Sequence, residues 1–205
     1  MERLVVVGNG MAGVACVEQI LKHSPKFEVT IFGDETHPNY NRILLSSVLA
    51  GEKTADEIVL NDLDWYQKNG IQLRLGVRIT DVDSKRKTLT GDDGSKTQFD
   101  KLLIATGSSP LIPPMEGTKK EGVYVFRNLE DARALLNQAG PGRKAVVIGG
   151  GLLGLEAARG LQVQGCDVTV VHLMDTLMER QLDWTGGSYL KAKMECLGVD
   201  LPAGE

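Results

Sequence analysis

Apolar runs alternate with helical patterns along most of this chain, and glycine clusters separate them. Residues 3–7 form a short run that ends in three consecutive valines, and residues 144–148 form a similar run. Runs of this kind are typical of strands buried on both faces of a parallel sheet. After the first run, Val14, Val17 and Leu21 recur at spacings of three and four, which indicates an amphipathic helix. We therefore predict an α/β protein with parallel sheets.

The succession of strand, glycine turn and helix occurs twice. Residues 8–13 read GNGMAG, and residues 149–154 read GGGLLG before a helical pattern that extends to about Gln164. A G-x-G-x-x-G between a strand and a helix is a dinucleotide-binding motif, in which the helix N-terminus faces the pyrophosphate. Two such motifs predict two Rossmann-like units, two different dinucleotides and electron transfer between them.

Each motif is followed by a second apolar strand with a polar residue near its end. The strand at 28–32 leads to Asp34, 21 residues past the first motif, and the strand at 167–171 leads to His172, 18 residues past the second. An acid at about 20 residues binds the adenosine ribose in such folds. Asp34 is therefore a predicted ribose ligand, and the alternative is a solvated turn residue.

Between the two motifs the pattern changes to short strands. We predict a small antiparallel meander as a crossover, formed by residues 71–75, 79–83 and 87–90, with a turn at 91–94. A buried strand returns at 102–107 and ends in a glycine, and the prolines from Pro110 onward mark a boundary. We therefore divide the chain into residues 1–109 and 110–205.

Further elements are predicted on both sides of this boundary. They are a short Asn-capped helix over 61–69, a strand over 123–127, a helix over 129–138 capped by Asn128, and helical segments over 177–179 and 186–197. The second region then holds fewer strands than a doubly wound domain needs, so we expect the chain to be a fragment.

Composition and charge exclude several classes of protein. The net charge is −4, with 24% charged and 42% hydrophobic residues, so no basic surface indicates nucleic-acid binding. The longest uncharged apolar run, 145–155, is shorter than the roughly 20 residues of a membrane span. The three cysteines form no C-x-x-C pair, which predicts neither a disulfide framework nor a metal site. The first strand begins too near Met1 for a signal peptide, and we expect a cytoplasmic protein.

Four motifs together resemble one family. They are GNGMAG at 8–13, Asn41-Arg42, Ala105-Thr106-Gly107 and GGGLLGLE at 149–156. With them the chain resembles the FAD-dependent pyridine-nucleotide oxidoreductases of the glutathione reductase fold. Through residues 40–47 and 178–183 it is most similar to the N-terminal flavoprotein part of NAD(P)H-dependent assimilatory nitrite reductase large subunits.

This resemblance implies that residues 1–109 are the N-terminal part of an FAD-binding domain. The FAD-binding residues that it implies are Gly8, Gly10, Met11, Ala12, Gly13, Asp34, Glu35, Asn41, Arg42, Ser46, Ile79, Ala105, Thr106, Gly107 and Arg127. Arg42 would meet phosphate or ribityl oxygens, and Arg127 would reach the flavin from the second domain. The alternative for both arginines is an ordinary surface position.

The resemblance also implies an incomplete NAD(P)H-binding domain over 110–205. The residues that it assigns to NAD(P)H are Gly149, Gly151, Leu152, Leu153, Gly154 and His172. Glu156 would lie near the nicotinamide and flavin rings as the catalytic residue, or would be an acid favoured there by the helix dipole alone. NADH enzymes of the family usually carry an acid where His172 stands. A histidine tolerates a 2′-phosphate, so NADH and NADPH both remain open.

The implied function is hydride transfer from NAD(P)H to FAD, followed by electron transfer to an iron–sulfur and sirohaem centre that reduces nitrite to ammonia. The partners would be the acceptor modules of a longer chain or a small redox protein, with a homodimer formed through C-terminal parts that are absent here. Ser47 replaces a lysine of ferredoxin and rubredoxin reductases, and residues 42–50 lack the cysteine of a thiol relay. The alternatives are a ferredoxin- or rubredoxin-type reductase and a non-catalytic dinucleotide-binding fragment.

Overall fold

The computed structural model describes residues 1–23 and 26–202. The chain forms two compact units, Met1–Asn41 with Ile58–Ser109, and Arg42–Glu57 with Pro110–Glu205. Residues 42–57, which the sequence prediction placed in the first domain, thus pack within the second unit. The last three residues of the predicted second domain lie outside the described residues.

The first unit is built on a four-stranded parallel sheet with the strand order β3-β2-β1-β7. Its strands are β1 (Glu2–Val7), β2 (Phe27–Gly33), β3 (Gln72–Leu75) and β7 (Lys101–Ile104). Helix α1 (Met11–His23) connects β1 to β2, as predicted, and α3 (Leu63–Lys68) precedes β3. Because the strands are parallel, their carboxyl ends meet at one edge of the sheet.

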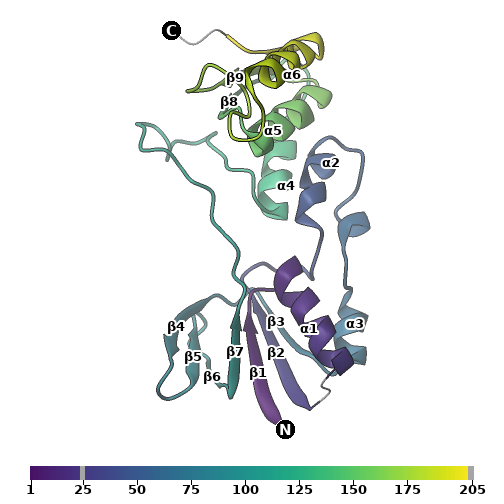
Figure 1. Cartoon of the computed structure of the whole chain (residues 1–205), viewed down its shortest axis with the longest axis vertical. Helices are drawn as coiled ribbons and strands as arrows, with labels where there is room; N and C mark the ends of the chain where they lie inside the picture. Colours follow the sequence, from purple (N-terminus) through teal and green to yellow (C-terminus); the bar gives the residue numbers. More distant parts are fainter. Residues whose placement is uncertain (24–25, 203–205) are drawn as a thin grey trace. The chain divides into compact units, whose positions relative to one another are not determined.

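The central strand β1 is buried on both faces, which explains its continuous valine run. Leu4 and Val6 pack with Val17 of α1 in one apolar cluster. Val5 and Val7 face the opposite side and pack in a second cluster with Leu89 of the antiparallel sheet. Figure 1 shows α1 and α3 on one side of the parallel sheet and β4–β6 on the other.

The antiparallel sheet is made of different strands from those of the predicted meander. Its strands are β4 (Ile79–Asp83), β5 (Thr88–Gly91) and β6 (Lys96–Gln98). The prediction that residues 71–75 belong to it is wrong, because β3 pairs in parallel with β2 from Thr30↔Gln72 onward. Buried Ile71 and partly buried Leu73 pack into the core shared with α1, and this packing decides the sheet that β3 joins.

The second unit contains a parallel sheet with the order β10-β9-β8. Its strands are β8 (Lys144–Ile148), β9 (Asp167–Val171) and the unpredicted β10 (Val199–Asp200). Its helices are α2 (Leu45–Leu49), α4 (Leu129–Gln138), α5 (Leu152–Val163) and α6 (Trp184–Cys196). Two short 3-10 helices flank α2, η1 (Arg42–Leu44) and η2 (Asp56–Ile58). The last residue of η2, Ile58, belongs to the first unit. Asn128 caps α4 within a full capping box, which confirms the predicted helix start.

Three predicted local structures are wrong. Residues 123–127 form no strand, and among the described residues no neighbouring strand pairs with them. Residues 177–179 form turns, because Met178 adopts a left-handed conformation with φ of 52° that interrupts a right-handed helix. Asp62 caps α3, since its side chain accepts the N–H of Trp65 at 2.8 Å, so Asn61 is not the cap.

Helix α2 belongs to the second unit because it packs against α4 and α5 (Figure 1). Leu49 is fully buried in the core that α5 shares with β9. A Cβ at Gly160 of α5 would lie 2.7 Å from Leu49 Cγ, so the absence of a side chain there admits the leucine. Gln164 also donates to the Leu49 carbonyl at 2.9 Å, which caps the end of α2.

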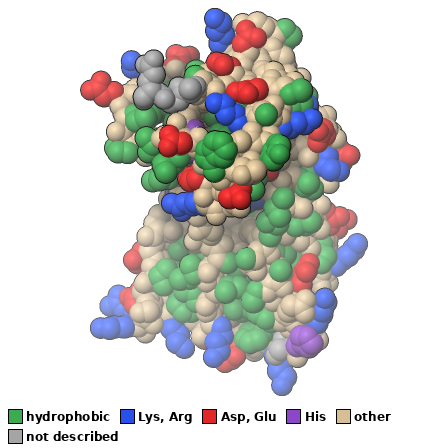
Figure 2. All heavy atoms as spheres, turned by 45° about the horizontal axis from the view of Figure 1, so that its top comes forward, with side chains coloured by type: hydrophobic (Ala, Val, Ile, Leu, Met, Phe, Trp, Pro, Cys, Tyr) green, Lys and Arg blue, Asp and Glu red, His purple; other side chains and the backbone are tan. Residues whose placement is uncertain are grey.

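Acidic and basic side chains are interspersed over the face of the molecule shown in Figure 2. This mixture agrees with the small net charge of the chain. Within the part of the chain that the structure describes, no helix has the length and apolar character needed to cross a bilayer.

Candidate dinucleotide-binding sites

The first glycine loop follows β1 and leaves open space beside its middle glycine. Gly8 has a φ of 114°, and a side chain there would overlap the Ala105 carbonyl. A Cβ at Gly13 would lie 2.6 Å from the Gly8 carbonyl oxygen, so only glycine lets α1 approach the loop. A Cβ at Gly10 would meet nothing within 4 Å. The loop is therefore tightly packed at its ends and accessible in its centre.

The loops after β2 and β7 lie beside this glycine loop. Gly8 donates to the Phe32 carbonyl of β2 at 2.8 Å, and Ala105 donates to the Val7 carbonyl of β1 at 2.8 Å. The structure thereby brings these first-unit candidates to one sheet edge: Gly8, Gly10, Met11, Ala12, Gly13, Asp34, Glu35, Ala105, Thr106 and Gly107. Asn41 lies in the same unit and donates to the Ile58 carbonyl at 2.8 Å.

The predicted ribose ligand Asp34 is exposed and forms an ion pair. Its Oδ2 accepts from Arg78 Nη2 at 3.0 Å. Arg78 directly precedes Ile79, which begins β4, and the adjacent Val77 donates to the Gly33 carbonyl at 3.0 Å. The sequence analysis did not name Arg78 as a site residue, although it directly precedes the predicted site residue Ile79. Its guanidinium holds the Asp34 carboxylate at this corner of the unit.

Glu35, the second candidate acid, is engaged by a neighbour. Its Oε2 accepts the phenol of Tyr40 at 2.6 Å. This short bond ties the strand end to the start of residues 40–47, the stretch that carries the narrower family resemblance.

A polar network supports the first loop from within the unit. Tyr66 donates to Asn9 Oδ1 at 2.8 Å and accepts the backbone N–H of Asn39 at 3.3 Å. Asn39 donates to Asn61 Oδ1 at 2.9 Å, and Asn61 donates to Glu18 at 3.0 Å. Burial raises the pKa of the Tyr66 phenol, although its hydrogen bonds with Asn39 and Asn9 act in the opposite direction. The network fixes Asn9, the residue between the first two glycines of the loop.

The second glycine loop repeats the main features of the first, although a Cβ at Gly149, unlike one at Gly8, would meet nothing within 4 Å. Gly149 has a φ of 118° and donates to the Val171 carbonyl of β9 at 2.8 Å, as Gly8 donates to Phe32. A side chain at Gly154 would overlap the Gly149 carbonyl, and one at Gly151 would meet nothing within 4 Å. Leu152 and Leu153 follow on the exposed start of α5. Both loops thus combine a closed turn with an open centre.

His172 lies directly after β9 and bonds on both ring nitrogens. Its Nδ1 accepts the backbone N–H of Gly150 at 3.1 Å, and its Nε2 lies 3.2 Å from Glu179 Oε2. The imidazole is 15% exposed. The structure thus places His172 against the second loop, beside a carboxylate that sequence reasoning missed.

Glu156, the predicted catalytic residue, lies in the first turns of α5. Burial raises the pKa of its carboxyl, and a hydrogen bond with the Ser46 side chain offsets part of this shift. Ser46 belongs to α2, so the packing of α2 on α5 brings these two candidates together.

Arg42 and Arg127, predicted to bind FAD, also lie together in the second unit. Arg42 Nη1 donates to the Arg127 carbonyl at 3.1 Å. The backbone N–H of Arg127 donates to Asp131 at 2.8 Å, within the capping box of α4.

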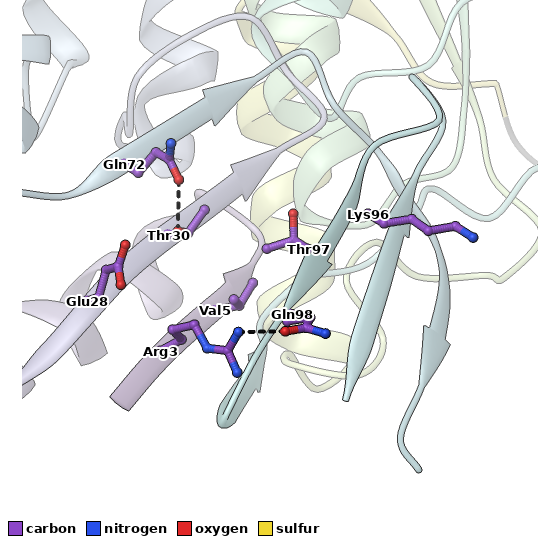
Figure 3. Close-up of a pocket in the computed structure, with 8 residues that line it drawn as sticks. All are labelled: Arg3, Val5, Glu28, Thr30, Gln72, Lys96, Thr97 and Gln98. Carbon is purple, nitrogen blue, oxygen red and sulfur yellow. Dashed lines mark hydrogen bonds between the residues drawn. The ribbon is translucent and has the colours of Figure 1, made fainter. Parts of the chain in front are cut away.

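The cavity in Figure 3 lies away from the first glycine loop. Arg3, Glu28 and Gln72 line it and stand near the starts of their strands, whereas the loop follows the end of β1. Arg3 of β1 donates to Gln98 of β6 at 2.9 Å, and Thr30 donates to its neighbour Gln72 on the adjacent strand at 3.2 Å. It is a polar hollow between the two sheets of the first unit.

All three cysteines are free, and none lies on α2. Cys166 is buried, Cys16 half-buried and Cys196 exposed. Within residues 1–23 and 26–202, no group of three or more His, Cys, Asp or Glu side chains is arranged to hold a metal ion.

Both glycine loops fit a dinucleotide pyrophosphate. A phosphate must approach the backbone where the middle glycine lies, and Gly10 and Gly151 both leave that space open. Each loop leads into a helix of twelve or more residues, α1 or α5, whose N-terminal N–H groups favour an anion.

Comparison with known proteins agrees with this architecture. The family model described as pyridine nucleotide-disulphide oxidoreductase matches residues 2–205. In Bacillus subtilis (strain 168), the assimilatory nitrate reductase electron transfer subunit is 51% identical over 97% of this chain and 26% of its own length. The nitrite reductase [NAD(P)H] of the same organism is 50% identical over 97% of this chain and 25% of its own length. The chain therefore spans about a quarter of these curated relatives.

A solved structure shows the same fold. In the covalent putidaredoxin reductase–putidaredoxin complex, one chain superposes with a TM-score of 0.89 and 28% identity, over 98% of this chain and 49% of that one. With the family model matched over nearly the whole sequence, the chain belongs to the pyridine nucleotide-disulphide oxidoreductase family.

Proposed function

We propose that this chain is the flavoprotein module of an assimilatory nitrite reductase, with FAD and NAD(P)H as its dinucleotides. The observation that carries the proposal is the repeated glycine loop, tightly packed at Gly8, Gly13 and Gly154 and open at Gly10 and Gly151. When bound, FAD would take a hydride from NAD(P)H and release electrons one at a time, chemistry that no side chain supplies.

Residues 1–109 would bind FAD through the sheet edge described above. The first loop would hold the pyrophosphate on backbone N–H groups, Asp34 would bind the ribose, and the backbone near Ile79 would face the adenine. Arg78 orients the Asp34 carboxylate through their ion pair. Thr106 and Gly107 would close over the nucleotide.

Residues 110–205 would bind NAD(P)H at the second loop. Glu156 would stand near the reacting rings, where burial raises the pKa of its carboxyl. Ser46 holds the Glu156 carboxyl by a hydrogen bond, and Arg42 and Arg127 would meet the flavin side.

The acceptor is inferred from the relatives. Two proteins of nitrate and nitrite reduction share about half of their aligned residues with this chain. The proposed route therefore runs from NAD(P)H through FAD to iron–sulfur and sirohaem modules of a longer chain, where nitrite is reduced to ammonia. The proposal includes a cytoplasmic location and a homodimer formed by parts outside this sequence.

Anaerobic mixing with FAD and NADH or NADPH tests the module. We expect loss of the flavin absorption band on addition of the reduced nicotinamide, faster than with free FAD. Binding of both nucleotides without that loss would contradict the proposal and favour a non-catalytic dinucleotide-binding module.

A reductase for a small iron–sulfur protein is the second candidate, and the fold match to a reductase bound to putidaredoxin favours it. Adding a ferredoxin or rubredoxin to the same mixture separates the two. Fast reduction of the small protein would favour this second candidate.

A further inference from the structure

The position that should hold the ribose-binding acid of the second unit carries none. In the first unit, β1 and β2 are paired so that Val7 faces Phe32, and Asp34 follows two residues later. In the second unit, Ile148 faces Val171 in the same register. The equivalents of Gly33 and Asp34 are therefore His172 and the apolar, exposed Leu173.

The two units fill the space beside the glycine loop in opposite ways. In the first unit Asn9 supplies a side chain, and a Cβ at Gly33 would lie 2.9 Å from Asn9 Cβ. In the second unit the loop residue is Gly150, and a Cβ there would lie 2.8 Å from His172 Cγ. His172 thus occupies from the strand the space that Asn9 occupies from the loop.

The hydrogen bonds of His172 define its tautomer. Because Nδ1 accepts the N–H of Gly150, it carries no proton, and the neutral ring then carries its proton on Nε2. That proton points to Glu179 Oε2 at 3.2 Å. The ring therefore orients the Glu179 carboxylate through Nε2 while Nδ1 is bonded to the glycine loop.

The segment that carries Glu179 is attached to the same loop. The N–H of Met178 donates to the Gly150 carbonyl at 3.0 Å, so both backbone groups of Gly150 are bonded. Leu177 is buried, and a Cβ at Gly150 would lie 2.6 Å from its Cδ2. The left-handed Met178 then turns the chain so that Glu179 faces the imidazole.

We propose that Glu179, oriented by His172, is the acid that contacts the adenosine ribose at the second loop and makes NADH the preferred nucleotide over NADPH. The inference rests on the proposed function of that loop as the NAD(P)H site. Its chemistry is that of a carboxylate, which accepts hydrogen bonds from ribose hydroxyls and repels a 2′-phosphate. Glu179 is a specificity-determining residue here, and His172 is a positioning residue that acts through it.

Arg180 is the neighbouring residue that could favour NADPH. Its charge acts on Glu179, and an arginine can accommodate a 2′-phosphate. Glu179, however, is bonded to a ring that is itself bonded to the glycine loop. We therefore expect the fixed carboxylate to outweigh the exposed guanidinium, with wild-type protein binding NADH about tenfold more tightly than NADPH.

Binding titrations with NADH and NADPH, followed by nicotinamide fluorescence, test the proposal. We expect Glu179→Gln to reduce the NADH-to-NADPH affinity ratio about tenfold, and His172→Ala to reduce it in the same direction although Glu179 remains. Asp175→Asn removes an exposed carboxylate from the same segment and is the matched control, with an unchanged ratio. Thermal unfolding of each variant establishes that the protein is folded.

A second readout is independent of nucleotide binding. Ring ¹⁵N chemical shifts of His172 should show an unprotonated Nδ1 and a protonated Nε2 near neutral pH, and Glu179→Gln should move the Nε2 signal. A protonated Nδ1 would overturn the arrangement.

The outcomes separate this inference from the function on which it rests. Binding of both nucleotides with an unchanged ratio in Glu179→Gln, or wild-type preference for NADPH, would overturn the inference alone. Absence of binding by either nucleotide to the folded wild type would overturn both.

Discussion

Glycine has two separable roles in these loops. Gly8 and Gly13 are required by the fold, because a Cβ at either position meets backbone atoms of the same unit. A Cβ at Gly10 would make no such contact, so the fold does not require glycine there. The missing side chain instead leaves space for a ligand. The distinction separates a structural requirement from a ligand requirement within one motif.

Replacing these glycines by alanine should therefore give opposite results. Gly10→Ala should change the free energy of unfolding by less than about 1 kcal/mol but weaken FAD binding at least about tenfold, because the methyl group enters the phosphate space. Gly13→Ala should lower the free energy of unfolding by about 1–3 kcal/mol. Urea unfolding and FAD titration measure the two effects, and unchanged FAD affinity in Gly10→Ala would contradict the proposed role.

Tyr66→Phe tests the network below the first loop. It leaves the Asn39 N–H and Asn9 Oδ1 without this partner in a buried site, so the free energy of unfolding should fall by about 1–3 kcal/mol. Tyr124→Phe, at a 40% exposed position in the second unit, is the control and should have little effect. Equal stability of both variants in urea would show that the phenol is not needed.

Asp100 should make stability depend on acid pH. Its carboxylate pairs with the Arg3 guanidinium through two bonds of 3.0 Å, and the Arg3 side chain and backbone hold the pKa of Asp100 well below its usual range. A lowered folded-state pKa stabilises the protein above the unfolded pKa of about 3.9, and this contribution is lost as the pH falls toward the folded value. Asp100→Asn should be less stable than wild type at pH 7, and the difference should shrink below about pH 4. A constant difference from pH 7 to 2 would be inconsistent with this pairing.

At the scale of the elements, packing assigns each segment to its unit. Helix α2 has only five residues, too few for stability on its own, and its place is determined by Leu49 against the glycine of α5. The same packing places Ser46 beside Glu156. A helix that lies in sequence between β2 and β3 of the first unit thereby contributes to the second unit.

Leu49→Ala should therefore destabilise the second unit. Removal of a fully buried leucine typically costs about 2–5 kcal/mol, because the cavity that it leaves closes only partly. Val163→Ala, at a 44% exposed position on α5, should cost less than about 1 kcal/mol and is the control. Denaturant unfolding followed by Trp184 fluorescence measures both, and a loss below 1 kcal/mol for Leu49→Ala would contradict the assignment.

At the scale of the molecule, each unit has an apolar core of its own and one tryptophan. Trp65 packs on the first-unit cluster, and Trp184 begins α6 in the second unit. Since the chain contains two tryptophans, single Trp→Phe variants report on each unit separately.

Ligands should accordingly stabilise the units selectively. In Trp184→Phe, FAD at 100 times its Kd should shift the Trp65 unfolding transition by about 2.7 kcal/mol, and in Trp65→Phe, NADH should shift the Trp184 transition similarly. NADH should shift the Trp65 transition less than FAD does, and FAD should shift the Trp184 transition less than NADH does. Equal responses of both reporters to either nucleotide would contradict the assignment of one dinucleotide to each loop.

Local sequence patterns were sufficient to predict the elements whose conformation depends on residues close together in sequence. The two strand–glycine–helix motifs, the Asn128 cap and the strand ends at Asp34 and His172 were predicted, because glycine conformations and apolar periodicity are specified within a few residues. The predicted binding roles of the site residues remain predictions, and the titrations above test them.

Long-range packing decided the rest. The sheet that β3 joins, the unit that receives α2 and the pairing of His172 with Glu179 depend on contacts between segments distant in sequence or on a turn such as that at Met178. Such contacts form when apolar faces and hydrogen-bonding groups find partners in three dimensions, and a one-dimensional pattern does not specify those partners.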